Sequence, residues 1–229
     1  MNLWADRPAA GDADDRTGRI AGLVRQQPDN GARHLFGCAG AFHRQGLIQP
    51  DARAAALSAV GGHAAVVSGS CSSATNGQVH DWLAGGRPGF RIDVLQLAAG
   101  APMAAQALAW AAPLLPVQPV LVYATTSADE VKSTQQQLGV EPAGALVEAC
   151  LAAIATGLLA LGVRRLVVAG GETSGAVVQA LDVKRLRVGL PIDPGVPWTQ
   201  AEGRPLLLAL KSGNFGSVDF FAKALSLAP

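Results

Sequence analysis

The sequence predicts an α/β protein with a mostly parallel sheet and helices on both of its faces. Two observations predict this class. From residue 63 onward, short apolar stretches alternate with alanine-rich helical patterns, which is the rhythm of βαβ units. Three of these stretches then run directly into turns rich in Gly, Ser and Thr. In a parallel sheet such turns emerge together at the carboxyl edge, where ligands of α/β sheets bind.

Composition limits the classes of partner. The chain of 229 residues is 49% hydrophobic and 15% charged, which suits a globular domain with a sizeable core. The formal net charge is +1 and the arginines are scattered, so we expect neither a nucleic acid nor a membrane as partner. The longest uncharged candidate for a membrane span, residues 149–163, is shorter than the roughly 20 residues that such a span needs. We interpret it as part of a buried helix.

The cysteine and histidine patterns give no metal site. Cys38, Cys71 and Cys150 are widely spaced and form no CxxC pair, which is typical of reduced thiols in a cytoplasm. Disulfides and zinc are therefore not expected, and a cytoplasmic location is. The histidines show no HExxH spacing and are interpreted as surface or hydrogen-bonded residues. They are His34, His43, His63 and His80.

The first 60 residues carry weaker patterns than the rest. Residues 1–31 are polar and rich in Asp, Arg, Gly and Pro. Residues 51–60 are alanine-rich and predict a helix that stops at Gly61 and Gly62. We therefore expect residues 61–229 to form the main domain and residues 1–60 to lie outside it.

Residues 63–124 predict three strands and two helices. The strands are expected over 63–69, 90–97 and 120–124 because these stretches are apolar and bounded by turn residues. Thr75 and Gln78 have the spacing of a capping box for a helix that ends at Gly85. A second, alanine-rich helix is expected over residues 102–115, before two prolines.

The remaining residues continue the alternation. Ser127 and Glu130 form a second capping-box pattern, for a helix to residue 138. A long apolar helix is expected over 145–161, with Glu148 near its start, where the helix dipole favours an acid. Strands are expected over 166–169, 186–192 and 206–210, and helices over 176–181 and at the end of the chain. The two prolines and the glycine of residues 193–198 predict an irregular loop.

The stretch over residues 166–175 organises the predicted site. An apolar strand stops at Gly170 and Gly171, which let a ligand approach the backbone. Thr173 or Ser174 is expected to cap a helix that begins near Ala176. Free N–H groups and the positive end of a helix dipole would then form an anion site. The alternative, an ordinary strand-to-helix loop with a good cap, stays open at this point.

Three such turns at one edge indicate a polyphosphate ligand. They cover residues 69–75, 170–175 and 211–217, and Lys211 would add a point charge. Neither a Walker A motif nor a GxGxxG fingerprint is present, and the serine of residues 171–175 is misplaced for a GxSxG nucleophile. Glu172 and Asp193 are the acids best placed for a phosphate-bound Mg²⁺. A capping role for Glu172 and a turn role for Asp193 are equally open.

Four motifs in order resemble one family. They are Val67-Ser-Gly-Ser-Cys-Ser72 with Thr75 and Gln78, then Ala169-Gly-Gly-Glu-Thr-Ser-Gly175, then Ile192-Asp-Pro-Gly-Val-Pro-Trp198, and finally Ala209-Leu-Lys-Ser-Gly-Asn-Phe-Gly216 with Asp219-Phe-Phe221. This set is similar to the carboxyl-terminal nucleotide-binding domain of the four-carbon acid sugar kinases, the 3-oxo-tetronate kinase group. The resemblance covers roughly residues 63–229.

The resemblance implies a Rossmann-like, three-layer nucleotide-binding domain of a kinase. Such a kinase uses ATP, assisted by Mg²⁺, to phosphorylate the terminal hydroxyl of a four-carbon acid sugar. Catalysis would consist of positioning and of charge stabilisation on the moving phosphoryl group. The ATP-binding residues carried over from the motifs are Gly69, Ser70, Ser72, Gly170, Gly171, Glu172, Thr173, Ser174, Lys211, Gly213 and Gly216.

The chain departs from the family pattern before residue 60. Family members open with a strand followed by Asp-Asp-Phe-Thr-Gly-Ala, whereas residues 14–18 read Asp-Asp-Arg-Thr-Gly with no apolar strand before them. We interpret residues 1–60 as a remnant of the sugar-binding domain and its linker, so the chain is expected to be incomplete for catalysis. The expected partners are ATP, a small acid sugar, and either a second copy or a separate sugar-binding half.

Two other functions stay open from the sequence. A non-catalytic nucleotide-binding or regulatory module would keep the fold and lose the reaction. A dinucleotide-dependent oxidoreductase rests on fold analogy alone, and the chain lacks the acid about 20 residues beyond a GxGxxG turn that such enzymes use.

Overall fold

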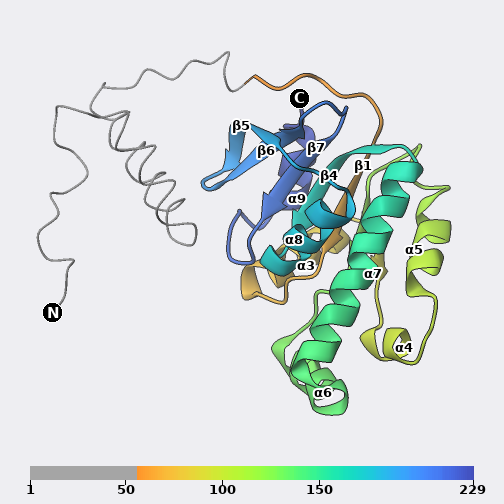
Figure 1. The fold of residues 1–229 in the computed structure, drawn as a ribbon. Helices are drawn as coiled ribbons and strands as arrows, with labels where there is room; N and C mark the ends of the chain where they lie inside the picture. Colours follow the sequence, from red (N-terminus) through yellow and green to blue (C-terminus); the bar gives the residue numbers. More distant parts are fainter. Residues whose placement is uncertain (1–55) are drawn as a thin grey trace, which may run out of the picture. The chain divides into compact units, whose positions relative to one another are not determined.

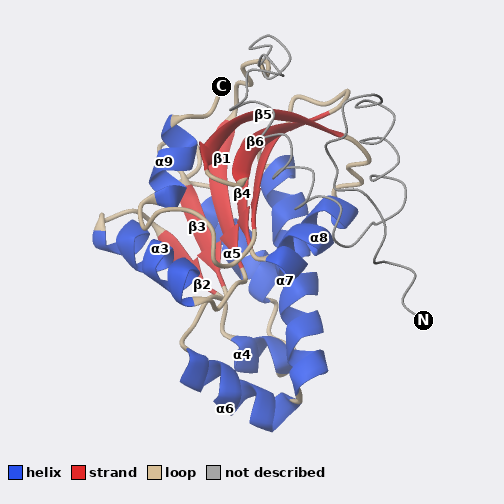
Figure 2. Cartoon of the chain, turned by 90° about the vertical axis from the view of Figure 1, so that its left-hand side faces the viewer, coloured by secondary structure: helices blue, strands red, loops and turns tan. Residues whose placement is uncertain are grey.

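The computed structural model describes residues 56–229, which contain a seven-stranded sheet in the order β2-β3-β1-β4-β7-β6-β5 (Figure 1). The strands are β1 (His63–Ser68), β2 (Gly89–Arg91), β3 (Val120–Tyr123), β4 (Val163–Ala169), β5 (Leu186–Asp193), β6 (Val196–Ala201) and β7 (Leu207–Lys211). The helices are α3 (Ser73–Ala84), α4 (Val94–Ala98), α5 (Met103–Ala111), α6 (Ala128–Leu138), α7 (Val140–Ala160), α8 (Gly171–Ala180) and α9 (Phe220–Ser226). Helices lie on both sides of the sheet, which confirms the predicted α/β class (Figure 2).

The sheet is parallel from β2 through β3, β1 and β4 to β7, and antiparallel at β6 and β5. The prediction of an irregular loop over residues 193–198 is wrong, because this segment is the tip of a hairpin between β5 and β6. Gly195 lies at the tip with a φ of 82°. Pro191 lies opposite Pro197 at a point where the pairing of β5 and β6 is irregular. The two residues that lack a backbone N–H group therefore occupy the same position and do not break the hairpin.

Alternate side chains of the central strands fill two separate cores. Ala65 and Val67 of β1 pack into the core covered by α5, α7 and α8, whereas Val66 packs into the core with Trp82 of α3 and Phe220 of α9. All three β1 residues are fully buried. Strands that are apolar on both faces are typical of a parallel sheet covered by helices on both sides.

Helix α7 is the longest element and lies across one face of the sheet (Figure 1). It begins at Val140, five positions before the predicted start, with Pro142 tolerated in its first turn. Among the described helices it is the one whose length and hydropathy would allow a membrane span. Leu151, Ile154 and Leu158 are nevertheless fully buried in the core, which agrees with the interpretation of a buried helix.

Two further predicted elements differ from the structure. The strand predicted over residues 90–97 is a three-residue strand, β2, followed by the short helix α4. The Asp93 carboxylate caps α4 by accepting hydrogen bonds from the N–H groups of Leu95 and Gln96. An Asp at this position is a helix-start signal in the sequence, which the prediction of a continuous apolar strand passed over. Residues 56–60 are not helical, and the rest of the helix predicted over 51–60 lies outside the described residues, as do Cys38, His34 and His43.

We predict that Leu158→Ala lowers the free energy of unfolding by about 2–5 kcal/mol, because it removes a fully buried side chain and leaves a cavity. The matched control is Leu161→Ala at the end of the same helix, where the side chain is 37% exposed. Urea denaturation followed by circular dichroism measures both. Equal losses in the two variants would contradict a core position for this face of α7.

Candidate functional site

The three predicted turns lie side by side at the carboxyl edge of the sheet. Strands β1, β4 and β7 are adjacent and parallel, with Ser68 opposite Ala169 and Ala169 opposite Lys211. These are the last residues of their strands. The turns that follow therefore meet at one place, as the alternating pattern predicted.

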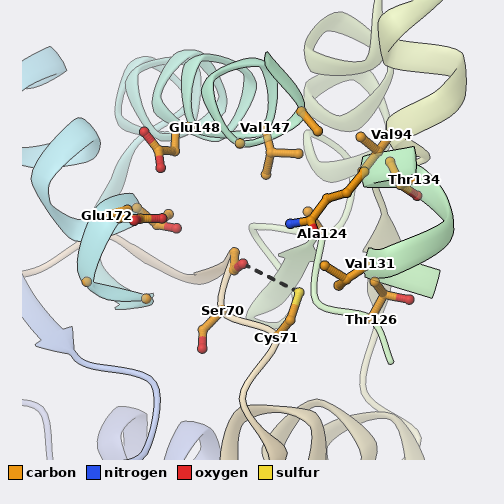
Figure 3. A pocket seen from close by; sticks show the side chains of 17 residues that line it. Ser70, Cys71, Val94, Ala124, Thr126, Val131, Thr134, Val147, Glu148 and Glu172 are labelled. Carbon is orange, nitrogen blue, oxygen red and sulfur yellow. Dashed lines mark hydrogen bonds between the residues drawn. The ribbon is translucent and has the colours of Figure 1, made fainter. Parts of the chain in front are cut away.

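A cavity of about 500 Å³ opens beside two of these turns. It is lined by Gly69, Ser70 and Cys71 after β1 and by residues 170–173 after β4, and it is closed on the other side by α4, α6 and α7 (Figure 3). This volume lies within the range of small-molecule sites. Of the predicted site residues, Gly69, Ser70, Gly170, Gly171, Glu172 and Thr173 line the cavity, whereas Ser72, Ser174, Asp193, Lys211, Gly213 and Gly216 do not.

The second turn presents a helix N-terminus to this cavity. Helix α8 begins at Gly171 and not near Ala176, and neither Thr173 nor Ser174 caps it, because Gly170 is the N-cap residue with a φ of 130°. Only glycine adopts this conformation without strain. The first N–H groups of a helix have no intrahelical partner, and residues 171–173 all line the cavity. The N-terminus of α8 therefore provides donors and a positive dipole end for an anion.

The glycines of these turns have different roles. A Cβ at Gly69 would lie 2.3 Å from the Thr173 hydroxyl, and one at Gly170 would lie 2.8 Å from the same atom. Their N–H groups are already used, since Gly69 donates to Ala169 and Gly170 to Lys211. A Cβ at Gly171, in contrast, would meet no atom within 4 Å. Close packing explains the first two glycines, while Gly171 leaves open space at the cavity wall.

Two carboxylates lie at the end of the cavity that the glycine turns form. Glu148 of α7 and Glu172 of α8 point toward one another across the opening (Figure 3). Burial, and then the charge of Glu172, raise the pKa of Glu148 above its ordinary value. Glu148 is nine residues into α7, so the helix dipole does not explain it, and the acid in the first turn is Glu141. One feature of the sequence points to Glu148, which is the single charge in the apolar helix predicted over residues 145–161.

The third turn is bound to the first by a hydrogen-bond network. The carbonyl oxygen of Gly213 accepts from the Ser72 hydroxyl at 2.6 Å, from the Thr75 hydroxyl at 2.9 Å and from Lys211 Nζ at 3.0 Å. Ser72 is also the N-cap of α3, where its oxygen accepts from the N–H of Thr75. The capping box predicted at Thr75 and Gln78 is therefore wrong, because the helix begins two residues before Thr75.

Gln78 instead holds the next part of the third turn. Its side-chain amide is buried and lies within hydrogen-bond distance of the carbonyl oxygens of Phe215, Gly216 and Ser217. Gly216 has a φ of 86° and faces the ring of Phe220. The two polar residues that suggested a capping box, Thr75 and Gln78, thus attach the β7–α9 loop to α3.

Lys211 is fully buried in this network. Its ammonium group donates to the Thr75 hydroxyl at 2.8 Å and to the Ser212 and Gly213 carbonyls, and no ion pair among the described residues includes it. Burial lowers the pKa of Lys211 from 10.5 to about 8. Its position inside the turn network, away from the cavity lining, differs from the point charge on a polyphosphate that the sequence suggested.

Asp193 is part of another contact. Its carboxylate accepts hydrogen bonds from the N–H and hydroxyl of Ser217 and forms an ion pair with Lys223 of α9. Lys223, and then the Ser217 N–H, lower the pKa of Asp193 below its ordinary value. Asp193 therefore holds the β7–α9 loop to the end of β5. The acid that shares the cavity with Glu172 is Glu148.

These features define a class of protein. A parallel sheet with its ligand cavity at the carboxyl edge, a glycine turn and a helix N-terminus facing that cavity are typical of nucleotide-binding domains. The family model described as "Nucleotide-binding C-terminal domain" matches residues 65–221. The chain belongs to this family.

Relatives identify the family more closely. A 3-oxo-tetronate kinase of Cupriavidus necator is 59% identical over 185 residues, which are 80% of this chain and 42% of that protein. One from Burkholderia multivorans is 60% identical, over 80% of this chain and 43% of its own length. A solved Haemophilus influenzae structure described as DUF1537 superposes with a TM-score of 0.75 at 36% identity, over 85% of this chain and 47% of that one.

The four-motif resemblance is thereby confirmed, and the chain is a member of the four-carbon acid sugar kinase family. It spans less than half the length of these relatives.

We predict that the buried Lys211 makes stability rise in alkaline solution. Between pH 8 and pH 10.5 the unfolded state binds more protons at this group than the folded state, so the free energy of unfolding increases by up to about 1.4 kcal/mol per pH unit. Urea denaturation across this window, compared with Lys211→Met, isolates the effect because the other titrating groups are common to both proteins. If the unfolding free energies of the parent and of Lys211→Met change in parallel with pH, the pKa of Lys211 is not lowered in the folded state.

We predict that Glu148→Gln raises the unfolding free energy at neutral pH, since it removes a charge that burial and Glu172 disfavour. A raised folded pKa means that the parent loses stability as the pH rises above the ordinary value of 4.5, so the difference should vanish near that pH. The control Glu141→Gln should destabilise slightly, because it removes an acid from the first turn of α7. Thermal unfolding at the two pH values measures both, and a destabilised Glu148→Gln variant would refute the unfavourable charge.

Proposed function

We propose that the cavity binds the phosphates of ATP at the N-terminus of α8 and at Ser70. The observation that carries this proposal is that residues 171–173, at the start of a ten-residue helix, line a 500 Å³ cavity together with the β1 turn. Free N–H groups and a helix dipole favour phosphate oxygens. The open space above Gly171 lets a phosphate approach the backbone.

The acidic pair makes a divalent cation part of this proposal. Glu148 and Glu172 would repel bare phosphates at the end of the cavity where the phosphates would lie. Carboxylates together with phosphate oxygens are the usual ligands of Mg²⁺. No group of three or more metal-ligating side chains is found among residues 56–229, which suits a metal that arrives with its nucleotide. Mg²⁺ held here would neutralise charge on the transferred phosphoryl group.

We infer further that the complete protein is a kinase for a four-carbon acid sugar. The support is the name 3-oxo-tetronate kinase shared by relatives that are 59% and 60% identical to this chain. The chain matches 42–43% of their length, so we place the acid-sugar site in the part that it does not match. The chain on its own is then expected to bind ATP without transferring its phosphoryl group to the sugar. A homodimer and a cytoplasmic location remain predictions.

We predict that Gly171→Val weakens ATP binding at least tenfold without unfolding the domain. The added side chain meets no protein atom within 4 Å, yet it fills the space at the phosphate donors. Titration calorimetry with ATP and Mg²⁺ should give binding to the parent and at least a tenfold loss in the variant, about 1.4 kcal/mol. Binding should also weaken when Mg²⁺ is removed with a chelator.

The matched control is Gly175→Val. Gly175 lies one turn further along α8, a Cβ there also meets no atom within 4 Å, and the residue does not line the cavity. This variant should bind ATP as the parent does. The proposal fails if the folded parent does not bind ATP at millimolar concentration, or if Gly171→Val binds it unchanged.

A further inference from the structure

Lys211 forms hydrogen bonds with all three turns at the carboxyl edge. Its backbone carbonyl accepts from the N–H of Gly170, the N-cap residue of α8, at 2.8 Å. Its ammonium group donates to the Thr75 hydroxyl of the first turn and to the Ser212 and Gly213 carbonyls of the third. The relative position of the three turns therefore depends on this residue.

The ammonium group of Lys211 is buried without a counter-charge. The residue is fully buried and its three acceptors are neutral, and a buried charge is costly unless an opposite charge lies near it. Within residues 56–229, none of the charged or titratable groups on the surrounding elements forms an ion pair with Lys211. They are Cys71 in the first turn, His80 and Asp81 of α3, Glu172 of α8, Asp193 of β5, Asp219 and Lys223 beside the third turn, and, at the opposite ends of β1 and β4, His63, Arg164 and Arg165.

The first turn lies between this charge and the cavity. Gly213, whose carbonyl accepts from Lys211, packs against Ser70, since a Cβ at Gly213 would lie 2.7 Å from the Ser70 hydroxyl oxygen. Ser70 in turn lines the cavity. A charge inside a protein attracts an anion across such a layer more strongly than it would in water. A polyphosphate at Ser70 would thus supply the missing counter-charge.

We infer that Lys211 is a positioning residue for the phosphate site and that the phosphates of the ligand are the counter-charge of its ammonium group. The inference rests on the proposed function, since it takes the phosphates to lie at α8 and Ser70. Lys211 acts through the turns that it joins and through its charge, without touching the ligand. Because the ligand favours the ammonium form, a neutral amine at Lys211 takes up one proton from solvent when ATP binds.

This coupling is measurable between pH 7 and pH 9. Burial lowers the pKa of Lys211 to about 8 in the free protein, and a bound anion raises that pKa. As the pH rises, the free protein loses a proton that the complex retains, so ATP binding weakens. A tenfold preference of the ligand for the ammonium form weakens binding about fivefold from pH 7 to pH 9, and binding at pH 9 then takes up about 0.4 proton.

The test is titration calorimetry with Mg²⁺–ATP at both pH values, in pairs of buffers with different ionisation enthalpies, which gives the affinity and the number of protons taken up. The parent should show the fivefold loss and the uptake. Lys211→Met has no charge at either pH, so it should show neither, and it should bind ATP about tenfold more weakly than the parent at pH 7. Lys211→Arg stays charged and should bind equally well at both pH values.

Two control variants exclude other causes. Lys223→Met removes the other ammonium group that holds the third turn, through Asp193 and Ser217, so a purely structural effect would appear there as well. Cys71→Ser removes a thiol of the cavity lining, another group that loses a proton in alkaline solution. Both variants should retain the proton uptake of the parent.

A second measurement needs no variant. Lys211 is the fully buried member of the four lysines, which are Lys132, Lys184, Lys211 and Lys223. In nuclear magnetic resonance spectra of the lysine ε-carbons, its signal should titrate at a lower pH than the other three in the free protein. Saturation with Mg²⁺–ATP should move this titration to higher pH.

The outcomes distinguish this inference from the proposed function. If the parent binds ATP without proton uptake, or the uptake persists in folded Lys211→Met or is lost in either control, the inference is refuted while the phosphate site stands. A Lys211 signal that titrates at the same pH with and without ATP refutes it too, whether or not Lys211→Met folds. If the folded parent does not bind ATP, the proposed function fails and this inference fails with it.

Discussion

Parallel pairing of β1, β4 and β7 is the constraint on which the site depends. Because the three strands end in register, at Ser68, Ala169 and Lys211, their turns meet at one edge although successive turns are about 100 and 40 residues apart in the chain. Packing holds this register, since a slip of one residue would exchange the buried side chains of these strands between the two cores. The cavity and the turn network are consequences of that register.

The polar groups at this edge are divided between two tasks. Ser72, Thr75, Gln78 and Lys211 attach the β7–α9 loop to α3 through carbonyl oxygens of the loop. The N-terminus of α8 and Ser70 face the cavity instead. A buried ammonium group with three neutral acceptors fixes the third turn, while its desolvation lowers the pKa of Lys211. Motif residues that look alike in the sequence thus include both loop anchors and candidate ligand contacts.

The carboxylates at the acidic end of the cavity differ from those that the sequence indicates as metal ligands. The sequence indicates Glu172 and Asp193, whereas the structure places Glu172 and Glu148 there. Glu172 follows a glycine turn and was therefore a candidate from the motif alone. Asp193 also stands at the end of a strand at the carboxyl edge, but its hydrogen bonds to Ser217 and its ion pair with Lys223 direct it to α9. Glu148 stands in a helix with no motif around it. It reaches the cavity because α7 packs across the sheet beside α8.

The amino-acid sequence alone was enough to predict the α/β class, the carboxyl-edge turns and the family, because alternating apolar stretches and glycine-rich turns are local patterns. It also gave Ser127 correctly as a cap, since that hydroxyl accepts from the N–H of Glu130 only three residues away. Three features became apparent only in the folded chain: residues 193–198 form the tip of a hairpin, Lys211 is buried, and Glu148 faces Glu172. Each of these depends on groups brought together across the sheet by packing, and no spacing along the chain encodes such a distance.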